Sequence, residues 1–199
     1  MPSQHRIPAR MASPVLPRGL LLLWLAASLA GCVSSTKYRP VSDTPVRIGK
    51  PYQVRGVTYV PAEDMAYDKL GYASWYGEES GRQTANGERF RHGSVAAAHT
   101  TLPLPSYVEV TSLDTGRTML VRINDRGPFV PGRIVDLSPA AAEFLGIRRK
   151  GVAAVRVRRV DPPEKDKKRL REGAAASARP TVPEATLATW RTRLNRVMQ

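Results

Sequence analysis

Short runs of β-branched and aromatic residues alternate with turn residues from Gly71 onward, and this pattern restricts the fold more than any other feature of the chain. Candidate strands lie at residues 72–76, 94–99, 107–113, 118–123, 133–136 and 152–160. The turn signal Asp114-Thr115-Gly116 separates two alternating runs and predicts a β-hairpin. Six strands within about ninety residues predict a small closed barrel of the mainly-β class.

One short helix is predicted among these strands. Ser138 can cap its first turn, Pro139 fits the first helical position, and Gly146 is placed to end it. We therefore treat residues 71–160 as one barrel domain.

Two segments precede this domain. Residues 32–48 contain Ser, Thr, Pro and Lys without a sustained apolar period, which indicates a tether. Residues 49–70 alternate apolar and polar residues around Gly56, which indicates a hairpin or extended arm that packs on the barrel. A free linker is the alternative for this arm.

Residues 161–199 begin with two prolines and a charged run, so we expect a basic, mostly disordered tail. Near its end, Leu187, Trp190, Leu194 and Val197 recur at helical spacing between arginines. A basic amphipathic helix of this kind could lie on an anionic surface. A frayed terminal helix, or one that docks on the barrel, explains the pattern equally well.

The first 31 residues have the order of a secretory signal peptide, with a basic leader and then the short apolar run Leu20–Leu29. The run is too short to span a bilayer comfortably and ends at Cys32, the single cysteine, like a bacterial lipobox. This predicts cleavage before Cys32 and its lipidation; an uncleaved apolar anchor is the alternative. Because Val33 rather than an aspartate follows, we expect the periplasmic side of the outer membrane.

The formal net charge of +14, from 31 basic and 17 acidic residues, makes an anionic partner plausible. The arginines are scattered through the chain, whereas nucleic-acid binders more often carry a concentrated stripe or a recognisable module. We therefore predict no nucleic-acid partner.

Glu88, His99 and Asp125 lie in loop-rich phrases crowded with glycine, proline and hydroxyl residues. Two carboxylates and an imidazole are the groups that cleavage of a glycosidic bond requires. From the residues alone a shared site remains one possibility, and His99 could equally be a hydrogen-bonded structural histidine.

Other chemistries lack their motifs. The sequence contains no GxSxG, no HExxH and no glycine-rich phosphate loop, and its histidines lack the close spacing of metal ligands. We predict neither a metal nor a cofactor.

Four long motifs carry a resemblance to a known family: GYASWYG (Gly71–Gly77), TANGERF (Thr84–Phe90), AAHTTLPLPSYVEVTSL (Ala97–Leu113) and VRINDRGPFVPGRIVDLSPAAAEFLG (Val121–Gly146). In this order, after a lipobox, they resemble the rare lipoprotein A (RlpA) family of septal-ring lytic transglycosylases over most of residues 49–160. The resemblance implies a six-stranded double-psi β-barrel with one short helix, flanked by flexible N- and C-terminal segments.

The resemblance also implies cleavage of the MurNAc–GlcNAc β-1,4 bond in peptidoglycan glycan strands, preferentially strands without stem peptides, to give 1,6-anhydro-muramyl ends. The alternatives are a noncatalytic peptidoglycan-binding lipoprotein of the same fold and a structural lipoprotein that bridges membrane and wall.

Site residues follow from the family motifs position by position. Asp125 is expected to donate a proton to the glycosidic oxygen, Glu88 to stabilise the sugar cation or assist deprotonation, and His99 to orient the carboxylates. Residues expected to contact the glycan are Tyr76, Thr84, Asn86, Arg126 and Phe129. Asp136, which precedes the predicted helix cap, is expected to be structural.

The expected partners are glycan strands, the membrane through the lipid on Cys32, and divisome or cell-wall amidase proteins. Many family members end in a glycan-binding SPOR domain of about seventy residues, and the segment after Val160 is too short and too polar to form one. Septal targeting through such a domain is therefore not predicted.

Overall fold

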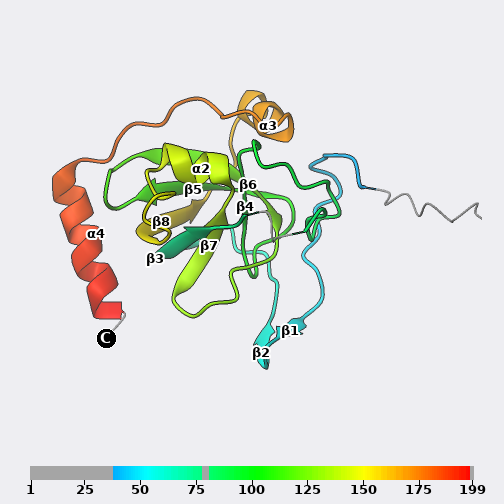
Figure 1. The fold of residues 1–199 in the computed structure, drawn as a ribbon, viewed down its shortest axis with the longest axis horizontal. Coiled ribbons are helices and arrows are strands. Elements are labelled where there is room, and N and C mark those ends of the chain that lie inside the picture. Colours follow the sequence, from blue (N-terminus) through cyan, green and yellow to red (C-terminus); the bar gives the residue numbers. More distant parts are fainter. Residues whose placement is uncertain (1–37, 78–80, 198–199) are drawn as a thin grey trace, which may run out of the picture. The chain divides into compact units, whose positions relative to one another are not determined.

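The computed structural model describes residues 38–77 and 81–197 (Figure 1). The predicted signal peptide and Cys32 lie outside the described residues. Within them no helix is long and apolar enough to cross a membrane.

Six strands close into a barrel in the order β3-β7-β4-β6-β5-β8 (Figure 1). They are β3 (Asp68–Trp75), β4 (Ala96–Ala98), β5 (Ser106–Ser112), β6 (Thr118–Asp125), β7 (Arg133–Leu137) and β8 (Ala153–Arg159). Strand pairs β3–β7 and β4–β6 are parallel, and the other pairs are antiparallel, including the predicted β5–β6 hairpin. Each strand overlaps a run identified in the sequence. The closed mixed barrel confirms the predicted six-stranded double-psi fold.

The barrel core is built from the β-branched residues that made the strands recognisable. Val108, Val121, Ile123, Val135 and Val155 are all fully buried. Burying one such side chain contributes about 1.5–3 kcal/mol relative to leaving it in water. The core therefore holds the barrel in one register and fixes the strand ends that carry polar residues.

Helix α2 (Pro139–Phe144) is the predicted short helix. The hydroxyl oxygen of Ser138 accepts a hydrogen bond from the backbone N–H of Ala141, and Pro139 occupies the first turn. Gly146 follows the helix with a φ of 74°, a conformation that favours glycine. The cap, the proline and the terminal glycine are thus confirmed.

Strands β1 (Tyr52–Val54) and β2 (Val57–Tyr59) form a separate two-stranded hairpin. The hydroxyl of Tyr52 donates to the backbone carbonyl of Thr100 at 2.7 Å. The rings of Tyr52 and Tyr59 stack 5.4 Å apart, and Phe129 packs against both. The hairpin is therefore attached to the loops at one end of the barrel.

Residues 38–48, here named the strap, differ from the free tether that the composition suggested. Asp43 accepts hydrogen bonds from the Nε of Arg122 at 3.2 Å and from the hydroxyl of Tyr107 at 2.8 Å, and it also pairs with Arg171. Arg39 binds the side-chain oxygen of Asn86. Because Arg122 is almost fully buried, its charge requires carboxylate partners, and Asp43 supplies one of them.

The segment after residue 160 also differs from the mostly disordered tail that we expected, because helices α3 (Glu164–Arg171) and α4 (Glu184–Val197) both pack on the barrel. Leu170, Leu187 and Leu194 are at most 4% exposed. The guanidinium of Arg156 lies 4.5 Å from the ring centre of Trp190. The apolar face of α4 is thus occupied by the barrel, in agreement with the docking alternative rather than with binding to an anionic surface.

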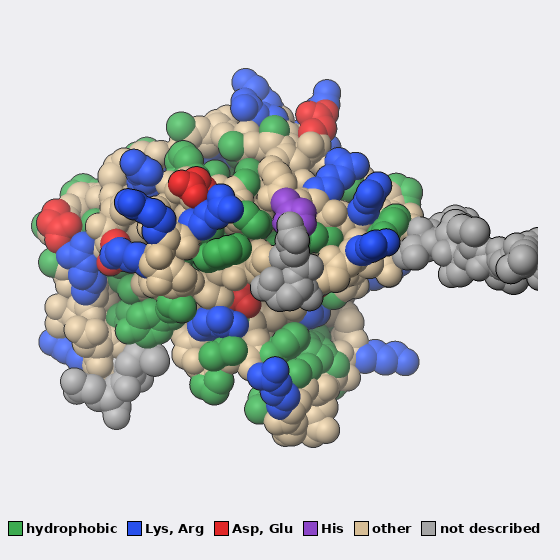
Figure 2. Space-filling model, viewed as in Figure 1, with side chains coloured by type: hydrophobic (Ala, Val, Ile, Leu, Met, Phe, Trp, Pro, Cys, Tyr) green, Lys and Arg blue, Asp and Glu red, His purple; other side chains and the backbone are tan. Residues whose placement is uncertain are grey.

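Lysine and arginine side chains are spread over the face shown in Figure 2 rather than gathered in one stripe. Many arginines have acidic partners, for example Arg158 with Glu109 and Arg133 with Asp136. The excess positive charge therefore does not form a single anion-binding track on this face.

Candidate active-site groove

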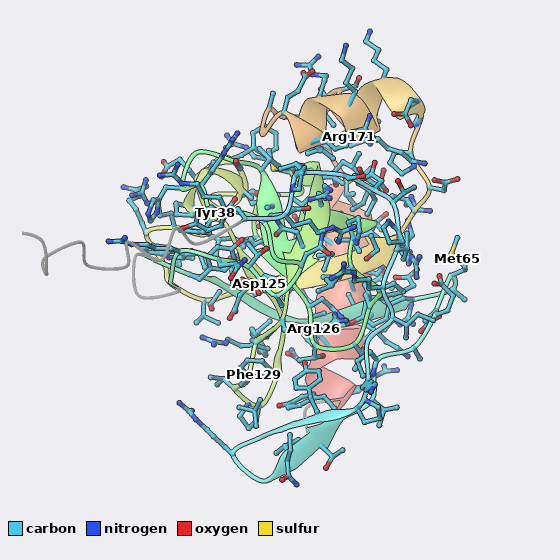
Figure 3. All side chains as sticks on the ribbon, turned by 90° about the vertical axis from the view of Figure 1, so that its right-hand side faces the viewer. Tyr38, Met65, Asp125, Arg126, Phe129 and Arg171 are labelled. Atoms are coloured by element: carbon cyan, nitrogen blue, oxygen red, sulfur yellow. The ribbon has the colours of Figure 1, made fainter. Side chains whose placement is uncertain are left out.

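An open groove of about 390 Å³ lies where the loop after β6 meets β7 and the β1–β2 hairpin. Figure 3 shows Asp125, Arg126 and Phe129 following one another from the barrel towards the hairpin. The residues that line the groove are Val54, Arg55, Tyr76, Gln83, Ala98, Asp125, Arg126, Gly127, Pro128, Phe129, Val130, Arg133 and Asp136. Three of the predicted glycan contacts, Tyr76, Arg126 and Phe129, belong to this set.

Two carboxylates face the groove from strands on either side of β4. Ala98 of β4 is paired with Asp125 of β6 on one side and with Asp136 of β7 on the other. Two strand spacings separate the backbones of the two aspartates by about 10 Å. Ala98 and Gly127 also line the groove beside these two aspartates.

Asp125 is held by its own loop. Its Oδ1 accepts hydrogen bonds from the backbone N–H groups of Ala85, at 2.7 Å, and Arg126, at 2.8 Å. Burial raises the pKa of Asp125, although these two hydrogen bonds and the charge of Arg126 oppose the shift. The carboxyl group can therefore hold a proton at a higher pH than an exposed aspartate can.

The guanidinium of Arg126 does not pair with Asp125. It donates to the backbone carbonyls of His99, Leu102 and Ile48. These bonds turn the cation towards the strap and the loop after β4, so its effect on Asp125 is limited to a longer-range attraction. This arrangement allows burial to determine the direction of the pKa shift.

Asp136 belongs to the site, which the sequence analysis did not predict. Its Oδ1 accepts from the hydroxyl of Ser74 at 2.6 Å, and its Oδ2 pairs with Arg133 at 3.3 Å. Burial raises the pKa of Asp136 despite these partners. The alternation along β7 could have identified it, because Asp136 is the one polar residue between the buried Val135 and Leu137.

The charges of both aspartates act on the hydroxyl group of Tyr76. Burial raises the pKa of its hydroxyl, and the charges of Asp125 and Asp136 raise it further. The phenol therefore stays protonated and can donate a hydrogen bond beside the carboxylates.

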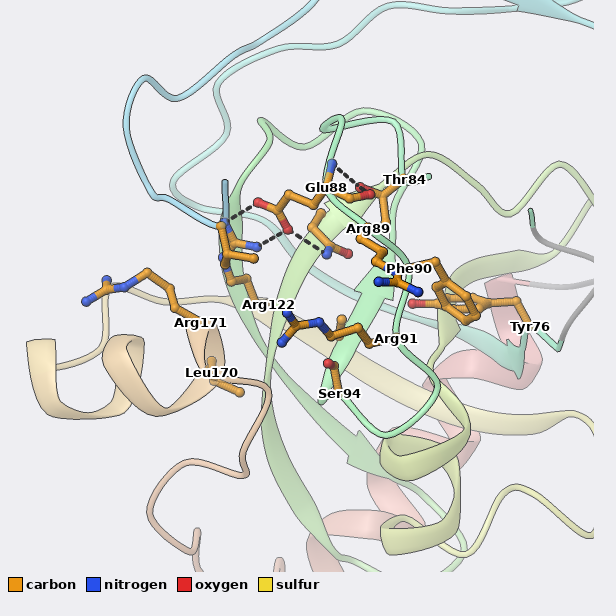
Figure 4. A pocket seen from close by; sticks show the side chains of 13 residues that line it. Tyr76, Thr84, Glu88, Arg89, Phe90, Arg91, Ser94, Arg122, Leu170 and Arg171 are labelled. Carbon is orange, nitrogen blue, oxygen red and sulfur yellow. Dashed lines mark hydrogen bonds and ion pairs between the residues drawn. The ribbon is translucent and has the colours of Figure 1, made fainter. Parts of the chain in front are cut away.

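Glu88 does not line this groove. Its side chain is 2% exposed, and the carboxylate accepts four hydrogen bonds, two of them from the guanidinium of Arg122 at 2.7 and 2.8 Å (Figure 4). Asn86 and Asn124 donate the other two, at 2.8 and 3.0 Å. The adjoining cavity measures about 30 Å³, too small for a sugar residue. The expectation that Glu88 and Asp125 share a groove is therefore not met.

Thr84 and Asn86, predicted to contact the glycan, instead shape the loop that carries Glu88. Thr84 is 5% exposed, and its hydroxyl accepts from the backbone N–H of Glu88. Asn86 is 1% exposed, and its side chain is shared between Glu88 and Arg39. The same loop contains Ala85, whose N–H binds Asp125, so these residues are linked to the groove indirectly.

His99 is also buried, at 2% exposure, and does not line the groove. Its Nδ1 accepts hydrogen bonds from the backbone N–H groups of Thr101 and Leu102, and Tyr67 packs edge-on against the ring. Burial lowers the pKa of His99 to about 3. The imidazole is thus neutral and shapes the loop that binds Arg126.

The part of the chain that the structure describes contains no group of three or more His, Cys, Asp or Glu residues arranged to hold a metal ion. The groove itself is lined by the carboxyl groups of Asp125 and Asp136, the phenol of Tyr76 and the guanidinium groups of Arg55, Arg126 and Arg133.

Comparison with known proteins places these residues in a family context. Residues 68–157 match a family model described as "Lytic transglycolase". An "Endolytic peptidoglycan transglycosylase RlpA" from Rickettsia bellii (strain RML369-C) is 36% identical over 159 residues, covering 69% of this chain and 70% of that protein. A relative of the same name from Pseudomonas aeruginosa (strain UCBPP-PA14) is 54% identical over 114 residues, covering 56% of this chain. That match spans 33% of the Pseudomonas protein.

Two solved structures resemble the chain more distantly. Streptomyces papain inhibitor (SPI) is 23% identical, covers 50% of this chain and 100% of its own, and has a TM-score of 0.41. Apo-expansin from Clavibacter michiganensis is 17% identical, covers 49% of this chain and 52% of its own, and has a TM-score of 0.39.

Proposed function

Because the chain belongs to the RlpA family of endolytic peptidoglycan transglycosylases, we propose that it is a lytic transglycosylase that cleaves the MurNAc–GlcNAc β-1,4 bond of glycan strands. The observation that carries this proposal is the pair Asp125 and Asp136, which faces one open groove with both pKa values raised by burial. Such a pair can supply a proton on one side of a sugar and accept one on the other.

Asp125 is the proposed proton donor. Its raised pKa favours the protonated form, and the groove is open at this position. The proton passes to the glycosidic oxygen as the bond between that oxygen and C1 of the muramyl residue breaks, and GlcNAc leaves with a new hydroxyl.

Asp136 is the proposed acceptor. Its ion pair with Arg133 favours the charged form, whereas Asp125 accepts its two hydrogen bonds from the neutral backbone amides of Ala85 and Arg126. The muramyl C6 hydroxyl attacks C1, a bond forms between O6 and C1, and the hydroxyl proton passes to Asp136. The product is a 1,6-anhydro ring without consumption of water, and the proton then returns to Asp125 through solvent.

Glu88 and His99 act in this proposal through the loops that they hold. Glu88 stabilises the loop whose Ala85 N–H binds Asp125. His99 organises the loop whose carbonyls accept from Arg126. Tyr76 donates a hydrogen bond to the reacting sugar, and Phe129 provides an apolar wall.

The proposed function also includes a location in the cell envelope and protein partners. Lipidation of Cys32 would hold the protein on the periplasmic side of the outer membrane, within reach of the wall. The preferred strands would lack stem peptides, so an amidase that removes those peptides would act before this enzyme, with divisome proteins as further candidate partners.

Purified protein incubated with amidase-treated sacculi tests the activity. Mass spectrometry should detect 1,6-anhydro-muramyl products, and both Asp125→Asn and Asp136→Asn should lower their yield by at least about 100-fold. Binding to sacculi without such products, or an unchanged yield from Asp125→Asn, would favour a noncatalytic glycan-binding protein.

A further inference from the structure

Arg55 differs from the two other arginines that line the groove. Arg126 is bound to three backbone carbonyls, and Arg133 is paired with Asp136. Within residues 38–77 and 81–197 the exposed side chain of Arg55 has no hydrogen-bond or ion-pair partner. Among the groove-lining residues that the structure describes, Arg55 is therefore an arginine whose charge has no partner.

The backbone of Arg55 is unusual. The pairing of Val54 with Val57 leaves Arg55 and Gly56 as a two-residue hairpin loop, with φ values of 49° and 81°. Turns with two positive φ values favour Asn, Asp or Gly at the first position, because a longer side chain is disfavoured there. Non-glycine residues held in this conformation are concentrated at functional sites.

The hairpin holds Arg55 in a defined place. The rings of Tyr52 and Tyr59 pack against Phe129, which belongs to the loop that begins after Asp125. The hydrogen bond from Tyr52 to Thr100 adds a second attachment. The hairpin tip is thus fixed relative to the two aspartates.

The charges of the groove indicate what Arg55 could bind. The charge of Asp136, and that of Asp125 after it has given up its proton, disfavour an anionic substituent near the reacting bond, whereas a cation at the rim of the groove stabilises one. An unpaired guanidinium is suited to a carboxylate, because its fork can donate two parallel hydrogen bonds.

We propose that Arg55 binds the lactyl carboxylate of a muramyl residue in the glycan strand, an inference that rests on the proposed transglycosylase function. The carboxylate is free when the stem peptide is absent and becomes a neutral amide when the peptide is attached. Arg55 therefore distinguishes stripped strands from substituted ones at this position of the groove.

Arg55→Asn is the informative substitution, because Asn-Gly suits this turn better than Arg-Gly does. Equilibrium binding is measured in an Asp125→Asn background, so that the strands are not consumed. The probes are glycan strands with free lactyl carboxylates and the same strands after conversion of those carboxylates to methylamides.

The Arg55→Asn variant should bind the free-acid strands about fivefold more weakly, bind the amidated strands unchanged, and keep or raise its Tm. The loss should shrink as salt is added. Arg149→Gln, an exposed arginine outside the groove, serves as the matched control and should change neither affinity.

Equal binding of free-acid strands by both proteins, equal weakening for both probes, or no binding of either probe would overturn the assignment of Arg55. The proposed function has a separate readout. If the wild-type protein releases no anhydro products but the charge-dependent loss appears, the transglycosylase proposal fails and the carboxylate site stands.

Discussion

Glu88 accepts hydrogen bonds from both terminal nitrogens of Arg122, whose Nε also bonds to Asp43 of the strap, and the side chains of Glu88 and Arg122 are each 2% exposed. Removal of the Glu88 charge would leave the buried Arg122 with Asp43, at 3.2 Å and 23% exposed, as its carboxylate partner, which is costlier than losing an ion pair in water.

Glu88→Gln should therefore lower the free energy of unfolding by about 3 kcal/mol, measured by urea denaturation at pH 7. Glu143→Gln is the matched control, because Glu143 pairs with Arg148 at the surface, where the side chains are 66% and 51% exposed. That substitution should change stability by less than about 1 kcal/mol. Equal effects of the two substitutions would contradict the structural role of Glu88.

Because His99 is buried in its neutral form, the free energy of unfolding should fall in acid. The unfolded state gains a proton near pH 6.5, whereas the folded state does so only near pH 3, because burial lowers the pKa of His99. Between these values the unfolded state binds more protons, so stability falls by about 1.4 kcal/mol for each unit of decreasing pH. Urea denaturation between pH 7 and 4.5 measures this slope. The slope should flatten in His99→Gln and persist in His92→Gln, whose histidine is exposed.

Asp125→Asn should stabilise the fold at pH 7 while it removes activity. The folded-state pKa of Asp125 is raised, so its ionisation costs stability as pH rises from the unfolded value through the folded one. The amide oxygen of asparagine can still accept from Ala85 and Arg126. The gain in Tm over the wild type should appear at pH 7 and vanish near pH 3. Asp68→Asn should show the opposite effect, a loss of Tm at pH 7, because the hydrogen bond from Arg156 lowers the pKa of Asp68.

Protonation of Asp125 also predicts how activity depends on pH. Product formation should decline as pH rises through the raised pKa of Asp125, because the donor loses its proton. Initial rates of anhydro-muramyl release measured at constant ionic strength should show this alkaline limb. A rate that rises steadily with pH would assign the donor role elsewhere.

Docking of α4 predicts that the tail contributes to stability. Leu194 is 2% exposed, and its replacement by alanine should cost about 2–4 kcal/mol, measured by urea denaturation. Val152→Ala, at a side chain that is 48% exposed, should cost less than about 1 kcal/mol. A Leu194→Ala variant as stable as the wild type would mean that α4 does not pack on the barrel in solution.

Sequence patterns predicted the barrel because its strands are short, alternating and separated by clear turns. The cap at Ser138 and the turn at Gly116 depend on local backbone chemistry, which the sequence states directly. The strap and the tail were harder to predict, since their order depends on partners far away in the chain. Asp43 contacts Arg171 across 128 positions, and no local pattern records that contact.

Only part of the candidate site was predicted, again because contacts between residues far apart in the chain leave no local pattern. Asp125 lies in a distinctive loop, and the family motif identifies it. Glu88 and His99 were recognised as important, but the sequence could not distinguish a buried positioning residue from one that faces a ligand. Asp136 was missed because its place beside a helix cap already offered a structural explanation.

The three-residue strand β4 has a consequence for how this family can vary. Ala98 pairs with Asp125 on one neighbouring strand and with Asp136 on the other, so β4 determines the distance between the two aspartates. Insertion or deletion of one residue in β4 would shift its pairing with β6 and β7 by one residue. Side chains would then turn to the other face of the barrel, and Asp125 and Asp136 would no longer lie opposite the same residue of β4. Loops around the groove can change length during evolution, whereas a length change within β4 should be removed by selection.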